Sequence, residues 1–149
     1  MLIRPTTMLA ISSGVVLGLG LYTFQYAQGF SYFSTDPRAC ANCHIMREQY
    51  DSWRKSTHHA AARCVDCHLP HSLVPKYIAK GVNGWNHSRA FTMQDFHEPI
   101  QITPLNSAIL ERNCRSCHEA LVSELVGSHA GGTEAIRCVG CHRSTGHGP

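Results

Sequence analysis

The sequence predicts a mainly α-helical protein, in which a single N-terminal transmembrane helix is followed by a small, irregular helical domain. Three observations support this fold class. The apolar segment Met8–Ala27 lies near the N-terminus, and two later segments have the apolar spacing of helices. No stretch alternates polar and apolar residues long enough to predict a strand.

The apolar segment has the length and flanks of a membrane span. No charged residue occurs from Pro5 to Thr35, and about 20 residues at helical rise cross the hydrocarbon layer. The aromatic residues of YTFQYAQGFSYF then follow as an interfacial belt. We expect a cytoplasmic N-terminus at residues 1–7, an anchor helix at 8–29 and a second domain at 30–149.

Arg4, the only charged residue before the span, predicts the direction of insertion. It favours a cytoplasmic N-terminus in a bacterial inner membrane, with the second domain on the periplasmic side. The alternative is a cleaved signal peptide, but signal h-regions normally run only about 7 to 15 residues. The length therefore favours a retained anchor.

All eight cysteines occur in four C-x-x-C-H motifs. Paired cysteines alone would also suit disulfides or zinc sites. A histidine directly after every pair is typical of covalent c-type haem, in which the thiols bond the porphyrin and the imidazole ligates iron. The sequence therefore predicts four haem c groups, attached at Cys40, Cys43, Cys64, Cys67, Cys114, Cys117, Cys138 and Cys141.

Four porphyrins also explain how so short a domain could fold. About 115 residues follow the apolar N-terminus, and a chain of that length with few long apolar runs buries a modest core. The net charge of +3 comes from scattered basic residues, so nothing indicates a nucleic-acid partner. We expect a mostly helical domain that encloses the haem groups, with helices in residues 48–61 and 107–129 and an extended connection at 98–107.

The motifs have a symmetric spacing. Their first cysteines are 24, 50 and 24 residues apart, which predicts two diverged two-haem units at residues 40–71 and 114–147, joined by residues 72–113. Each unit has a histidine before its second motif, His58 or His129, and another after it, His71 or His147.

The motif histidines are His44, His68, His118 and His142. Electron-transfer haems usually take a second histidine or a methionine as sixth ligand. The first motif reads CHIM, so both His44 and Met46 are credible ligands there. The remaining candidates are His58, His59, His71, His87, His97, His129 and His147.

The anchor, the motif order and the stretches YDSWRKSTHHAAARCVDCHLPHSLVPKYIAKGVNG and CVGCHRSTGH resemble the NapC/NirT family of membrane-anchored tetrahaem quinol dehydrogenases. CHIM is the most specific element, and it resembles the members that serve cytochrome c nitrite reductase. The resemblance implies Met46 as axial ligand of the first haem, with His44 displaced. It also implies His58 as distal ligand of the third haem and His147 as that of the second.

For the fourth haem, held by His142, the resemblance implies a sixth ligand from a lysine of the catalytic subunit. His129 is the alternative, because its counterpart in the first unit, His58, is an expected ligand.

The segment from His71 to Ser88 is expected to form a helix with one apolar face beside Lys76 and Lys80. That face carries Leu73, Val74, Tyr77, Ile78, Val82 and Trp85. The helix could lie in the lipid headgroup layer or pack on haem. The resemblance favours the membrane, and implies a quinol pocket in which Lys80 holds the quinol oxygen.

His87 stands where the family often has an aspartate. Quinol oxidation releases protons, and a histidine can accept them near neutral pH. His87 could instead bind the iron of the first haem and close the site.

We therefore expect an electron-transfer subunit that takes electrons from menaquinol, in the membrane quinone pool, to the pentahaem catalytic subunit of ammonia-forming nitrite reductase. The alternative is the same relay serving a nitrate or trimethylamine oxide reductase. The C-x-x-C-K motif of the catalytic subunit is absent from the sequence, so nitrite reduction by this chain alone is not expected.

Overall fold

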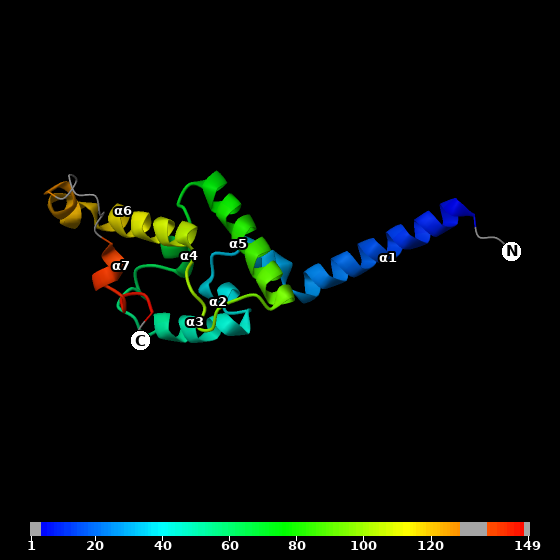
Figure 1. Cartoon of the computed structure of the whole chain (residues 1–149), viewed down its shortest axis with the longest axis horizontal. Coiled ribbons are helices and arrows are strands. Elements are labelled where there is room, and N and C mark those ends of the chain that lie inside the picture. Colours follow the sequence, from blue (N-terminus) through cyan, green and yellow to red (C-terminus); the bar gives the residue numbers. More distant parts are fainter. Residues whose placement is uncertain (1–3, 129–136, 148–149) are drawn as a thin grey trace. The chain divides into compact units, whose positions relative to one another are not determined.

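The computed structural model describes residues 4–128 and 137–147, and the chain divides into two compact units, Met1–Ser34 and Thr35–Pro149. Every regular element in the described ranges is a helix (Figure 1). The mainly α-helical fold class is confirmed.

The first unit contains α1, which spans Pro5–Tyr26, and the 3-10 helix η1, which spans Gly29–Phe33. Pro5 lies in the first turn, where the N–H that proline lacks would have no partner in any case. No residue of α1 is buried within the structure, and the helix is long and apolar enough to cross a membrane. This helix fits the predicted membrane anchor.

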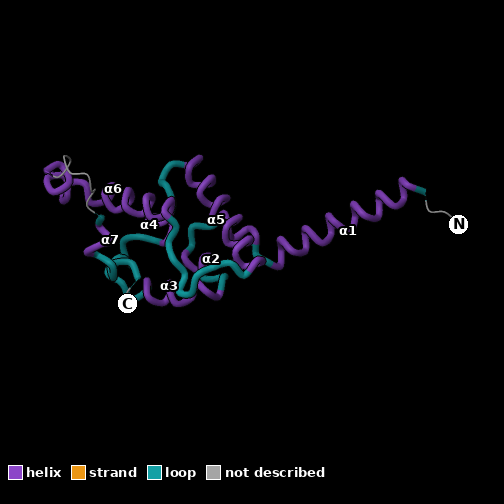
Figure 2. The backbone as a smooth tube through the Cα atoms, in the orientation of Figure 1, coloured by secondary structure: helices purple, strands orange, loops and turns teal. Residues whose placement is uncertain are grey.

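The second unit combines two long helices with several short ones, joined by turns and loops (Figure 2). Its elements are α2 (Pro37–Cys40), η2 (His44–Met46), α3 (Arg47–Trp53), α4 (Cys64–His68), α5 (Leu73–Met93), α6 (Pro104–Ser128) and α7 (Cys138–Cys141).

Two helix boundaries differ from the predictions. The helix expected at 48–61 ends at Trp53, and the Trp53 indole N–H donates to the Ala62 carbonyl at 3.0 Å across the turns that follow. The expected extended connection stops at Thr103, because α6 already begins at Pro104. Proline suits this position, since its fixed φ matches the first helical turn.

The apolar interior of the second unit is small. Among the described residues, the buried hydrophobic side chains are Val65 and Leu69 at α4, Ala79 on α5 and Ile109 on α6. Asn113 of α6 is buried beside them. The tightest packing between helices therefore lies where α4 meets the first half of α6.

Candidate functional site

Three of the four C-x-x-C-H motifs are built on helices. The second motif is α4 itself, and the fourth forms α7 with His142 directly after it. The third lies inside α6, where the helical geometry breaks at His118, with φ −106° and ψ 16°. Residues three apart share one face of a helix, so each of these motifs can present both thiols to one porphyrin.

The first motif has a different backbone. Cys40 ends α2, Cys43 is extended with φ −78° and ψ 119°, and the 3-10 helix η2 then carries His44 and Met46. His44 is exposed and Met46 is half-buried. In the first motif, therefore, no α-helical turn joins the two cysteines, in contrast to the other three motifs.

His68 and His147 are far apart in the sequence, but their side chains lie close together, with the two Nε2 atoms nearest to each other. Their Nε2 atoms are 3.5 Å apart, and their rings are 5.8 Å apart with an interplanar angle of 32°. A metal–imidazole bond is about 2 Å long, so a metal between two imidazoles separates the nitrogens by about 4 Å. Small adjustments of this pair would admit an iron atom between the rings.

The environment of the pair favours ligation through Nε2. The Nδ1 atom of His147 lies 3.1 Å from the Gln49 carbonyl of α3, to which it can donate, and this leaves Nε2 as the acceptor. Burial and the neighbouring His147 lower the pKa of His68, which keeps its imidazole neutral, the form that binds metal.

A second imidazole pair joins His58 to the third motif. The rings of His58 and His118 are 6.0 Å apart, with an interplanar angle of 59°. The adjacent His59 has other surroundings, because its ring packs edge-on against Trp53 at 4.8 Å. The structure therefore distinguishes these two neighbouring histidines, which composition alone could not.

The thiols of successive motifs lie near one another. A hydrogen bond with the Cys64 thiol lowers the pKa of Cys40 to about 7, and the same bond together with burial raises the pKa of Cys64. Burial raises the pKa of Cys67, with a further contribution from the nearby Cys117. Cys114 in turn interacts with Cys138 of the fourth motif. The motifs thus follow one another in space in the order of the sequence.

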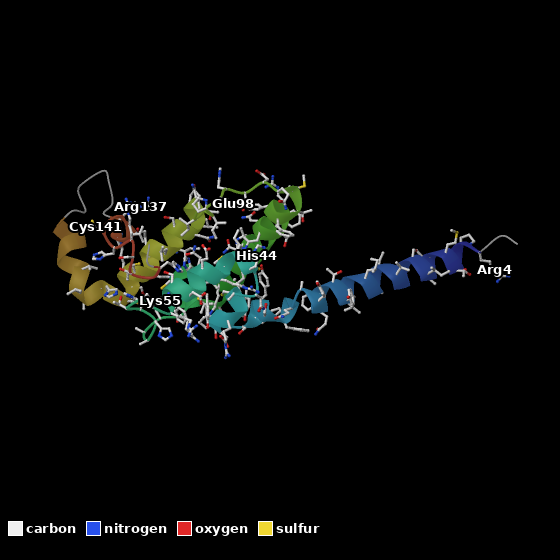
Figure 3. All side chains as sticks on the ribbon, turned by 90° about the horizontal axis from the view of Figure 1, so that it is seen from below. Arg4, His44, Lys55, Glu98, Arg137 and Cys141 are labelled. Carbon is white, nitrogen blue, oxygen red and sulfur yellow. The ribbon has the colours of Figure 1, made fainter. Side chains whose placement is uncertain are left out.

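His44 and Cys141, from the first and fourth motifs, lie toward opposite ends of the second unit in Figure 3. The four motifs therefore extend along the length of this unit.

α5 brings Lys80 close to the first motif. The Lys80 ammonium lies 5.8 Å from the centre of the Tyr77 ring, and its charge interacts with Cys40. Burial and then the nearby Lys76 lower the pKa of Lys80, although Cys40 opposes the shift. A lysine with a lowered pKa exchanges its proton more readily.

His87 is exposed on α5, seven residues after Lys80 and so about two turns along the same side of the helix. Several large apolar residues of α5 are also exposed, among them Leu73 at 69%, Val74 at 67% and Trp85 at 72%. None of the described residues of the second unit buries them.

Other candidate histidines take no part in the two pairs. His71 contacts the Asp66 carbonyl through Nε2 at 3.0 Å, and His97 and His142 are exposed. His129 lies outside the described residues. Sequence reasoning missed the Gln49 carbonyl, because a backbone contact leaves no signal in residue type.

Comparisons with known proteins agree with the resemblance. The model of the NapC/NirT cytochrome c family, N-terminal region, matches residues 3–149. The cytochrome c-type protein NrfH of Wolinella succinogenes is 40% identical over 90% of this chain and 81% of its own length. The cytochrome c nitrite reductase subunit NrfH of Nitratidesulfovibrio vulgaris is 29% identical over 96% of this chain and 86% of its own.

Among solved structures, the chain is similar to one from the cytochrome c nitrite reductase NrfHA complex bound to the HQNO inhibitor. The TM-score is 0.66, the identity is 27%, and the match covers 90% of each chain. Together these relatives support the binding of haem c.

The two neighbouring histidines offer a test of the second imidazole pair. His58→Ala should convert one low-spin haem to the high-spin state, because the ring facing His118 is lost. His59→Ala should leave the spectrum unchanged, because that ring packs on Trp53. Electron paramagnetic resonance of the oxidised protein measures both, and equal spectra for the two variants would contradict the pairing.

Proposed function

The chain belongs to the NapC/NirT cytochrome c family, and we propose that it is a membrane-anchored tetrahaem quinol dehydrogenase that feeds a periplasmic nitrite reductase. In this proposal α1 holds the protein in the inner membrane and the second unit faces the periplasm. When bound, the haems carry single electrons from menaquinol to the catalytic subunit.

The pairing of histidines from distant parts of the chain carries this proposal. His68 with His147, and His58 with His118, would each hold one haem iron with two imidazoles, the ligand set of low-spin electron-transfer haem. A site for substrate chemistry would instead keep one axial position open. These two sites therefore suit electron transfer and not nitrite reduction.

The first and fourth motifs would bind haem differently. The extended backbone at Cys43 and the half-buried position of Met46 support Met46, and not His44, as the residue that would hold the iron of the first haem. His142 would ligate the fourth haem, whose sixth ligand would come from a lysine of the partner or from His129. The two ends of the relay would thus differ in ligand set from its centre.

Lys80 and His87 would handle the quinol. Lys80, close to the first motif, would donate a hydrogen bond to a quinol oxygen. His87, two turns further along α5, would accept a proton that the quinol releases. The exposed apolar face of α5 would lie in the headgroup layer, with Lys76 and Lys80 near anionic lipid.

Similarity to the NrfH proteins favours nitrite reductase as the partner. Escherichia coli NapC and TorC are also relatives, but they are 26% and 22% identical, and the chain spans 66% and 43% of their lengths. The NrfH relative from Nitratidesulfovibrio vulgaris and the solved complex both belong to cytochrome c nitrite reductase.

Purification from membranes tests the partner directly. The protein extracted in mild detergent should copurify with a pentahaem subunit, with a fixed ratio of the two chains. The complex should reduce nitrite with a menaquinol analogue as electron donor. The isolated chain should oxidise the quinol analogue without reducing nitrite. Recovery of a lone tetrahaem chain, with no nitrite reduction when the pentahaem subunit is added, would rule this function out.

A substitution on α5 tests proton transfer. His87→Ala should slow quinol oxidation by about 100-fold or more with haem content unchanged, because a general base contributes that much. His87→Asp should retain most of the rate, since a carboxylate can also accept the proton.

His97→Ala, an exposed histidine beyond the end of α5, is the matched control and should have no effect. Full activity of His87→Ala would remove this residue from the mechanism. A changed spectrum of the first haem in that variant would instead identify His87 as an iron ligand.

A further inference from the structure

Asn113 holds the backbone on both sides of His68. Its side chain is 6% exposed, and its amide nitrogen donates to the Cys67 and Leu69 carbonyls at 2.9 Å each. The two N–H bonds of the amide are thus both used. Because Asn113 directly precedes Cys114, one side chain connects the second motif to the third.

The short length of α4 explains why this contact matters. The last four carbonyls of a helix have no partner within it, and α4 has only five residues. A buried carbonyl left without a hydrogen-bond donor destabilises the folded state. Asn113 supplies a donor for one of these carbonyls, that of Cys67, and for the carbonyl of Leu69, the residue that caps α4.

Glu111 makes the corresponding contact with the fourth motif. Its carboxylate accepts hydrogen bonds from the backbone N–H groups of Cys138 at 2.8 Å and Val139 at 3.3 Å. Arg137, labelled with Cys141 in Figure 3, adds an ion pair to Glu111 at 3.8 Å. The first half of α6 therefore contacts the motif before its own and the motif after it.

We propose that α6 is a spacer that sets the placement of the second, third and fourth haem sites, with Asn113 and Glu111 as its positioning residues. Asn113 would fix the peptide units around His68 and hence the ring that faces His147. Glu111 would fix the start of the fourth motif. This inference rests on the proposed haem sites but on neither the quinol nor the partner.

The experiment compares full-length holoprotein variants by electron paramagnetic resonance and redox titration. His147→Ala first identifies the low-spin signal of the second haem, which it should abolish. Asn113→Asp has nearly the shape of asparagine, but an ionised carboxylate cannot donate to the two carbonyls. It should shift the signal of the second haem, whereas a space-filling role predicts the wild-type signal. The midpoint potential is compared in the neutral Asn113→Ser, because the charge of an aspartate would lower the potential by itself.

Two further variants act as controls. Asn106→Ala removes a side-chain hydrogen bond on the same helix, the 3.0 Å bond to Asn83, without touching a motif. It should change neither the signal nor the midpoint potential of the second haem. Glu111→Ala should also leave the second haem unchanged, because its contacts lie at the fourth motif.

The outcomes separate this inference from the proposed function. An unchanged second-haem signal in Asn113→Asp, or an equal shift in Asn106→Ala or Glu111→Ala, overturns the positioning role. If His147→Ala abolishes no low-spin signal, the ligand assignment itself fails. Where Asn113→Asp does not accumulate with haem, Asn113→Ser, which keeps one donor, is judged by the same criterion.

Discussion

The scarcity of buried apolar side chains constrains everything else in the second unit. Its described residues bury four hydrophobic side chains at the junction of α4, α5 and α6, while many large apolar residues stay exposed. So small a core cannot offset the conformational entropy of ordering more than a hundred residues. Covalently attached porphyrins would supply the missing apolar volume, and the four C-x-x-C-H motifs are where the chain can attach them.

Because the core is small, polar contacts and histidine pairs connect the helices of this unit, which in most proteins are held together by a larger apolar core. His147 lies beside His68 although 79 residues separate them in the sequence, and the Gln49 carbonyl orients the His147 ring. Asn113 and Glu111 connect α6 to the neighbouring motifs. The first motif lacks the helical turn of the others, so in the proposed function it would offer a different iron ligand. One scaffold would then hold haems of unlike ligand sets in series.

The sequence predicted the features that depend on residue type and spacing. The apolar run gave α1, the motifs gave the cofactor class, and the resemblance gave the family, which the comparisons confirm. It did not predict that α3 ends at Trp53 or that α6 begins at Pro104, because a contact across a turn and a proline's fixed φ decided these boundaries. The contacts of Asn113 and Glu111 with the neighbouring motifs were also not predicted, since they depend on which carbonyls and N–H groups the fold brings beside them. The sequence also could not predict that His58 lies near His118 whereas His59 packs on Trp53, because this depends on the direction of each side chain in the fold.

The central claim is that all four thiol pairs carry haem and that the anchor is retained. Intact-protein mass spectrometry of the chain isolated from membranes measures both at once. The proposed structure predicts the mass of the full polypeptide plus four haems, with no cysteine left to react with an alkylating reagent. A mass showing fewer haems, alkylated or disulfide-bonded cysteines, or loss of the segment before Gly29 would contradict it.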